Sequence, residues 1–222
     1  MTNLILTRYL YNYEGVRKTL IHTILSQQEQ EVAFFWGYEM YYSGFHKETA
    51  ELLQEIYENF YQEHYPKLGE FIHKKITSIT KDPTIVATII KNLLVKQIHP
   101  KKPESKNPKF ITIKPNQIES FMTKPNIESP WKYLREVCKY YLLSEIYEYD
   151  IFQMWRENWL YYSYRTPIWK ERIDQYKGII DDDSKKIIFE DEDCEENFYN
   201  IYGYESDEQP LEIQKRCLGI ST

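Results

Sequence analysis

The stretch EVAFFWGYEMYYSG, residues 31–44, decides the fold class of this chain. Its apolar side chains cover almost the whole circumference of a helix, and a helix that is apolar all round is normally buried. Gly37 in its middle costs about 1 kcal/mol relative to alanine, which indicates close approach of a neighbouring helix. We therefore expect residues 31–44 to form a central helix that stops at Gly44. The apolar set is Val32, Phe34, Phe35, Trp36, Tyr38, Met40, Tyr41 and Tyr42.

Four more helices are expected, one before this segment and three after it. Residues 14–26 and 47–61 carry apolar stripes at helical spacing, and Pro66 stands where a first helical turn tolerates proline. Asp82-Pro83 then forms an N-cap and N1 pair before another apolar face. Five short helices with brief connections predict a helical bundle or a helical-repeat-like array.

The amino-acid composition changes near residue 98, after which prolines are too frequent for a helix to form. Residues 99–109 are expected to be an exposed loop, and KFITIK, residues 109–114, alternates like a short edge strand. We therefore predict an N-terminal helical lobe over 1–98, a Pro- and Lys-rich linker over 99–125 and a C-terminal helical lobe over 126–222. Six of the ten prolines lie between residues 100 and 130: Pro100, Pro103, Pro108, Pro115, Pro125 and Pro130.

The second lobe is expected to be helical with one interruption. Helices are predicted after Ser129-Pro130, over about 150–164 and after Thr166-Pro167. Residues 179–189, IIDDDSKKIIF, have two β-prone ends around a polar turn and predict a small hairpin. A helix capped by Asp191 and a last short helix after Pro210 complete the lobe. The predicted fold class is mainly α, two-lobed, with a small β-hairpin in the C-terminal lobe.

Composition narrows the class of protein. The chain has 222 residues, a formal net charge of −6 and a pI near 5.5, which argues against a globally basic nucleic-acid-coating protein. No apolar run reaches the roughly 18 residues that a membrane span needs. Cys138, Cys194 and Cys217 lie far apart in the sequence, so neither a disulfide framework nor a zinc ribbon is indicated. We expect a soluble protein of a reducing compartment.

Common catalytic motifs are missing from the sequence. The glycine spacing excludes a Walker A loop, and there is no Gly-x-Ser-x-Gly, Cys-x-x-Cys or His-Glu-x-x-His. The five histidines form no pair at metal-ligand spacing on one helix, so no metal and no cofactor is predicted. An enzyme of unfamiliar type stays open as an alternative, and its site would require Tyr38, Glu39, His46 and Arg165 to converge.

Two segments of opposite charge are the candidate binding residues. Residues 181–209 hold twelve acids against two lysines, and we single out Asp181, Asp182, Asp183, Asp191 and Asp193 as an acidic partner surface. Asp181 to Asp183 are also oxygen ligands of the kind that Mg²⁺ takes, but we favour a solvated turn beside an acidic helix start. Residues 91–125 hold eight lysines against two glutamates, and Lys101, Lys102, Lys106, Lys109 and Lys114 are the candidate contacts to nucleic acid or to a partner. Phe110 and Phe121 are the aromatic groups near enough in sequence to stack on bases, and the acidic surface of another copy is an alternative partner.

Tyrosine occurs 21 times and alanine three times, a bias that AT-rich codons explain and that also suits a binding face rich in tyrosine. Three blocks, residues 34–45, 161–173 and 198–210, include Phe34-Phe35-Trp36-Gly37-Tyr38, Pro167-Ile168-Trp169 and Asp207-Glu208-Gln209-Pro210. Together they resemble a family of uncharacterised proteins of giant viruses, the nucleocytoplasmic large DNA viruses. The resemblance implies a viral setting, in the infected-cell cytoplasm or the virion, and no catalytic residue.

From these observations we expect a non-enzymatic structural or protein-interaction protein, associated with the particle, that binds a protein partner or itself. An accessory factor of viral replication or transcription that touches nucleic acid through the lysine residues is the alternative. Outside a viral setting the expected location is the cytoplasm.

Overall fold

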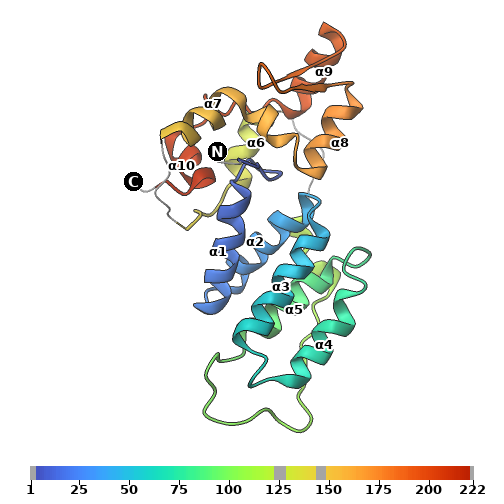
Figure 1. Cartoon of the computed structure of the whole chain (residues 1–222), viewed down its shortest axis with the longest axis vertical. Helices are drawn as coiled ribbons and strands as arrows, with labels where there is room; N and C mark the ends of the chain where they lie inside the picture. The colour runs from blue at the N-terminus through green and yellow to red at the C-terminus, as the bar shows by residue number, and fades with distance from the viewer. Residues whose placement is uncertain (1–3, 123–128, 144–148, 221–222) are drawn as a thin grey trace. The chain divides into compact units, whose positions relative to one another are not determined.

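The computed structural model describes residues 4–122, 129–143 and 149–220, and the chain folds into two compact units (Figure 1). The middle unit comprises Arg17–Thr123, and the terminal unit comprises Met1–Val16 together with Lys124–Thr222. Ten α-helices and one antiparallel hairpin, which lies in the terminal unit, form most of the regular structure of the described residues. The predicted mainly α fold with a small hairpin near the C-terminus is confirmed.

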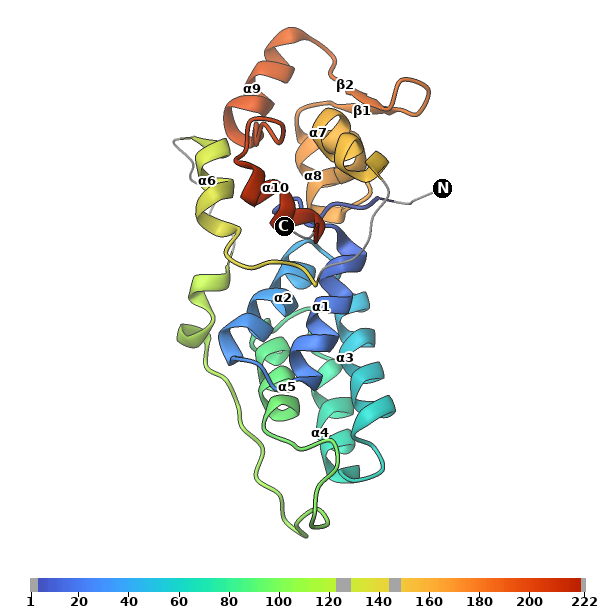
Figure 2. The same cartoon turned by 90° about the vertical axis from the view of Figure 1, so that its left-hand side faces the viewer.

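The middle unit is a bundle in which α5 contacts three other helices, α2, α3 and α4, while α2 also packs on α3 (Figure 2). α1 begins in the terminal unit and ends in the middle unit. α1, α2 and α3 lie within two residues of the expected segments, and α4 and α5 begin within one residue of the expected Pro66 and Pro83. Their bounds are α1 (Tyr13–Leu25), α2 (Gln30–Tyr42), α3 (His46–Phe60), α4 (Pro66–Ile76) and α5 (Thr84–Leu94).

The expected burial of the segment 31–44 is confirmed in α2. Every residue from position 33 to position 41 is buried, and Trp36 is 0% exposed. A Cβ atom at Gly37 would lie 2.5 Å from Cδ1 of Ile90, so the glycine allows α5 to approach α2 closely. Gly44 follows the helix with φ of 94°, a conformation that costs glycine little.

The edge strand expected over residues 109–114 is wrong, because side chains of α5 take the place of a neighbouring strand. The Asn92 side chain accepts a hydrogen bond from the N–H of Ile111 (3.0 Å) and donates one to its carbonyl oxygen (2.8 Å). The N–H of Ile113 donates to Oγ1 of Thr88 at 3.0 Å. Two 3-10 turns follow, η1 (Pro115–Gln117) and η2 (Glu119–Phe121). The second half of the expected linker is therefore fixed to the middle unit.

The terminal unit contains the remaining helices and the hairpin, whose strands pair antiparallel with Ile179 opposite Ile188 and Asp181 opposite Lys186. α6, α8, α9 and α10 start at the expected proline and aspartate signals. α7 has a break where Asn158 leaves helical geometry with φ of −131°. The bounds are α6 (Pro130–Val137), α7 (Tyr149–Ser163), α8 (Pro167–Gln175), β1 (Ile179–Asp181), β2 (Lys186–Ile188), α9 (Glu192–Tyr202) and α10 (Leu211–Leu218).

The first residues of the chain belong to the core of the terminal unit, which differs from the division at residues 98 and 126 expected from the prolines. Three buried side chains of α7, α8 and the turn between them donate to carbonyl oxygens of this segment. Trp155 Nε1 donates to Leu10 (2.8 Å) and Trp169 Nε1 donates to Thr7 (3.0 Å). Thr166 Oγ1 donates to Leu6 at 2.6 Å. Indole and hydroxyl donors thus hold an N-terminal segment that no sequence pattern links to residues more than 140 positions away.

No helix in the described part of the chain has both the length and the apolar character needed to cross a membrane.

Candidate interaction surfaces

The acid-rich segment folds into the hairpin turn, α9 and the chain that follows α9, and it presents its carboxylates to solvent. Asp181 is half-buried and the other eleven acids of residues 181–209 are exposed. We call these twelve residues the acidic surface. Glu190 is the one member that forms an ion pair with a described lysine, Lys177. The members are Asp181, Asp182, Asp183, Glu190, Asp191, Glu192, Asp193, Glu195, Glu196, Glu205, Asp207 and Glu208.

Hydrogen bonds within the hairpin turn set the direction of its aspartates. The Asp181 carboxylate accepts from the Ser184 hydroxyl (2.6 Å) and from the Asp183 N–H (3.1 Å). These bonds, the hydroxyl first, hold the pKa of the Asp181 carboxyl below its usual range. Asp182 accepts from the Tyr161 hydroxyl at 2.8 Å. These hydrogen bonds fix the orientation of the Asp181 and Asp182 carboxylates in the turn.

The N-terminus of α9 carries the predicted cap. Asp191 Oδ1 accepts from the N–H of Cys194 at 2.7 Å, which satisfies one of the otherwise unpaired donors of the first turn. The thiol of Cys194 and then its N–H lower the pKa of the Asp191 carboxyl, and the same contact raises the pKa of the thiol. A raised pKa disfavours the Cys194 thiolate, which is the nucleophilic form of a cysteine.

A buried guanidinium attaches α9 to α8. The Arg172 Cζ atom lies 4.6 Å from the Trp169 ring centroid and 4.8 Å from that of Tyr202, so the cation is held between two rings. Phe198 of α9 is also fully buried. One face of α9 is therefore anchored while its carboxylates remain in water.

The hairpin adds an apolar element beside the aspartates. Ile179 and Ile188 lie opposite each other across the two strands, and they are 64% and 49% exposed. The two side chains form a small apolar patch on one face of the hairpin.

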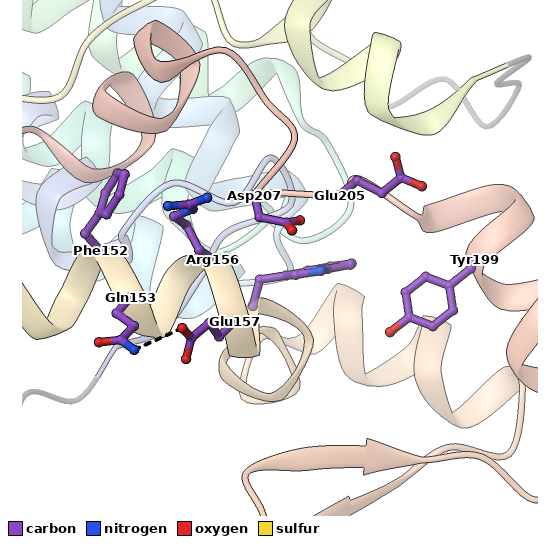
Figure 3. A pocket seen from close by; sticks show the side chains of 8 residues that line it. Phe152, Gln153, Arg156, Glu157, Tyr199, Glu205 and Asp207 are labelled. Atoms are coloured by element: carbon purple, nitrogen blue, oxygen red, sulfur yellow. Dashed lines mark hydrogen bonds between the residues drawn. The ribbon is translucent and has the colours of Figure 1, made fainter.

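An open cleft of about 620 Å³ lies between α7, α9 and the residues after α9 (Figure 3). Phe152 and Arg156 project from one side of α7, and Gln153 and Glu157 project from the other. The Arg156 guanidinium covers the Phe152 ring at 5.5 Å, and Gln153 donates to Glu157 at 2.9 Å. The complete lining is Phe152, Gln153, Arg156, Glu157, Trp159, Tyr199, Glu205 and Asp207.

The far wall of the cleft is fixed at the break in α7. The buried hydroxyl of Ser206 donates to the Trp155 carbonyl oxygen (3.1 Å) and approaches that of Arg156 (3.3 Å). Its neighbours Glu205 and Asp207 are thereby placed at the cleft, two members of the acidic surface. Sequence analysis did not find this cleft, because the break in α7 brings together residues from positions 152 to 207.

Charged and aromatic side chains line the cleft together. Its three carboxylates outnumber its one guanidinium, so it carries an excess of two negative charges. Partial burial, with the carboxylate of Glu195 as the smaller cause, raises the pKa of Tyr199 to about 12, which keeps its phenol neutral. The rings of Trp159, Tyr199 and Phe152 offer apolar walls. Carboxylates beside aromatic rings suit the charged heads and apolar stems of lysine and arginine.

One cluster of potential metal ligands occurs among the described residues. Glu190, Asp191 and Cys194 bring one ligand atom each within 4.8 Å of one another. The cap at Asp191 and the pair between Lys177 and Glu190 already explain this arrangement. Asp181 to Asp183, the alternative magnesium ligands, are held by the turn contacts described above.

All five candidate lysines are exposed, but the aromatic residues beside them are occupied. The Phe110 ring stacks on Phe71 with centroids 4.4 Å apart, and the Phe121 ring stacks on Tyr38 at 5.4 Å. One face of each ring is therefore already covered by a neighbouring ring of the middle unit. The five lysines are Lys101, Lys102, Lys106, Lys109 and Lys114.

Three of the four residues of the alternative enzyme site, Tyr38, Glu39 and His46, lie in the middle unit. The Tyr38 hydroxyl donates to the carbonyl oxygen of Pro83 at 2.9 Å, and burial raises the pKa of this phenol far above its usual range. Glu39 is fully buried, and the His46 ring lies against Tyr41 at 4.4 Å. Arg165 belongs to the terminal unit and is exposed.

No protein-family model, no curated protein and no solved structure matches this chain.

Proposed function

We propose that this chain is a non-enzymatic structural or protein-interaction protein whose terminal unit binds a lysine- or arginine-rich segment of a protein partner. The observation that carries this proposal is the exposure of eleven of the twelve acids of the acidic surface, with one ion pair to a described lysine. So many uncompensated carboxylates repel one another, and a basic partner relieves that repulsion while it steers association.

The cleft supports the same function. Glu157, Glu205 and Asp207 are placed to receive cationic heads, while Trp159 and Tyr199 offer rings to their stems. The exposed pair Ile179 and Ile188 provides apolar contact area that electrostatics alone does not supply.

The proposed setting is a cell infected by a large DNA virus, in the cytoplasm or in the virus particle. Support comes from the three-block resemblance and from the abundance of tyrosine over alanine. A partner identified as a particle protein would favour the structural role.

The alternative function, nucleic-acid contact, rests on the five exposed lysines of residues 101–114. They can contact phosphate groups but read no sequence. Because Phe110 and Phe121 are stacked within the middle unit, this contact would depend on charge and would weaken steeply with salt.

The test is affinity capture of the tagged full chain from its native setting, with and without nuclease, analysed by mass spectrometry. One variant combines Asp183→Asn, Asp193→Asn, Glu195→Gln and Glu196→Gln, which removes four exposed negative charges without touching the Asp181 turn or the Asp191 cap. We expect nuclease-resistant partners rich in lysine or arginine, and we expect the variant to lose them.

The matched control removes four exposed acids of the middle unit: Glu31→Gln, Glu48→Gln, Glu63→Gln and Glu70→Gln. It should retain the partners, because its net charge changes equally while the acidic surface is intact. Equal capture by both variants contradicts the proposal. Partners that disappear with nuclease would instead support the nucleic-acid alternative, with Lys101 and Lys102 as the residues to change next.

A further inference from the structure

Two cysteines that lie 79 positions apart meet in the core of the terminal unit. The Sγ atoms of Cys138, at the end of α6, and Cys217, in α10, are 3.7 Å apart. Both side chains are 0% exposed. Both thiols donate to the same acceptor, the carbonyl oxygen of Tyr9, at 3.6 Å.

Backbone contacts hold the two cysteines in register. The Arg216 guanidinium donates to the carbonyl oxygen of Cys138 at 2.9 Å, and the N–H of Asn12 donates to that of Cys217 at 2.8 Å. The N–H of Leu142 donates to the Arg216 carbonyl oxygen at 3.3 Å. These hydrogen bonds join the backbone near Cys138 to the backbone near Cys217.

The step from this arrangement to a covalent bond is short. A disulfide has an S–S distance of about 2.05 Å, so the two sulfurs need to approach by roughly 1.7 Å. Rotation about the Cα–Cβ bonds of the two residues is the movement that brings the sulfurs together.

We propose that Cys138 and Cys217 are a modification site that forms a reversible disulfide. With a small disulfide such as oxidised glutathione as the oxidant, one protein thiolate attacks a glutathione sulfur and releases one glutathione thiolate. The second protein thiolate then attacks the protein sulfur of the mixed disulfide and releases the second. Two protein thiols lose two electrons and two protons, and one oxidised glutathione becomes two reduced glutathione molecules.

Access to the buried pair requires local opening, and α10, which carries Cys217, is a short helix of eight residues. Oxidation should therefore be slower than that of a surface thiol of equal reactivity, and mild denaturant should accelerate it. Cys194 is more accessible, but its contact with Asp191 disfavours its thiolate.

The experiment incubates the full chain in glutathione redox buffers, quenches with acid, alkylates the remaining thiols and digests with trypsin. Cleavage after lysine and arginine separates the cysteines into peptides 136–139, 187–215 and 217–222. We expect peptide 136–139 linked to peptide 217–222 as the dominant product, two hydrogens lighter than the sum of its parts, with Cys194 alkylated. The oxidised protein should melt roughly 5–15 °C higher, and dithiothreitol should reverse both changes.

The unfolded chain provides a control that makes this result specific. In urea, loop-closure entropy favours the pair 194–217, whose 23-residue separation compares with 79 for the pair 138–217, by roughly sixfold. Oxidation of the folded protein should instead favour the pair 138–217. The variant Cys194→Ser should form the 138–217 link to the same extent as the parent chain. A statistical mixture of pairs from the folded protein overturns the proposal, as does the absence of the 138–217 link in the most oxidising buffer. This result is independent of partner capture, so the two proposals fail separately.

Discussion

Asn92 is one of the residues that fix the proline-rich segment to the middle unit, and replacing it tests that interpretation. Its side chain is 1% exposed and makes three hydrogen bonds, to the N–H and carbonyl oxygen of Ile111 and to the carbonyl oxygen of Thr88. Asn92→Ala removes all three. The two bonds to Ile111 join positions 19 apart and are the ones that hold the segment.

The expected loss of stability follows from these contacts. A net hydrogen bond contributes about 1 kcal/mol, and the two bonds to Ile111 therefore account for about 2 kcal/mol. Ile111 is 38% exposed, so water replaces the lost partners and no full desolvation penalty arises. We expect Asn92→Ala to lower the free energy of unfolding by about 2–3 kcal/mol, including the cavity left by the amide.

The variant Asn92→Asp keeps the size of the side chain but removes its amide donor, so it tests the hydrogen bonds separately from the cavity. The carboxylate still accepts from Ile111 but turns its second oxygen toward two carbonyl oxygens, so it should cost more than alanine at neutral pH. Since burial favours the protonated acid, which can donate, the folded state binds a proton more tightly than the unfolded one. The deficit of this variant should therefore shrink as pH falls.

Urea unfolding followed by circular dichroism gives the free energies, and hydrogen exchange of the Ile111 and Ile113 amides localises the effect. Protection at both should fall in Asn92→Ala, while the exposed control Asn116→Ala leaves it unchanged. A loss below 0.5 kcal/mol, taken as about half of one net hydrogen bond, refutes the reasoning. So does an aspartate variant that is more stable than the alanine variant at neutral pH.

Three further predictions follow from the same structure. Trp36→Ala should cost about 3–5 kcal/mol in a denaturant melt, because the indole is fully buried in α2, and a cost under about 1 kcal/mol contradicts a central position. Asp191→Ala should cost about 1 kcal/mol by removing the cap on the Cys194 N–H, whereas Asp193→Ala should change little; equal losses would show that the cap bond is not the cause. Burial raises the pKa of Tyr204 from 10.0 to about 12, so the folded state favours its neutral form; this stabilisation, about 3 kcal/mol, is complete below pH 10 and is lost as pH rises toward 12. Urea melts across that range should fall less steeply in Tyr204→Phe than in the parent chain.

Local signals predicted the helices because their causes are local. The apolar circumference of residues 31–44 required burial, and Gly37 indicated the helix that packs on it, which is α5 through Ile90. Asp191 marked the start of α9 through the bond that it makes three residues later. Patterns of this kind need no information about distant residues.

The sequence predicted the candidate surface only in part. The acidic segment was found because charge is read directly, and its exposure follows from the cost of burying a carboxylate. The cleft needed the break at Asn158 and the bond from Ser206 to α7, which have no sequence signature. Phe110 and Phe121 were expected to be available near the lysines for stacking on bases. In the structure their rings stack on Phe71 and Tyr38 instead.

By itself the sequence determined the helices, the hairpin and the separation of acidic from basic residues, since periodicity, capping and charge act over a few residues. Tertiary structure alone decided that the first residues complete the terminal unit, that Asn92 fixes the proline-rich segment, and that Cys138 meets Cys217. Each of these depends on a contact between distant positions. Such contacts form because buried N–H, carbonyl and thiol groups must find partners wherever packing brings the chain together.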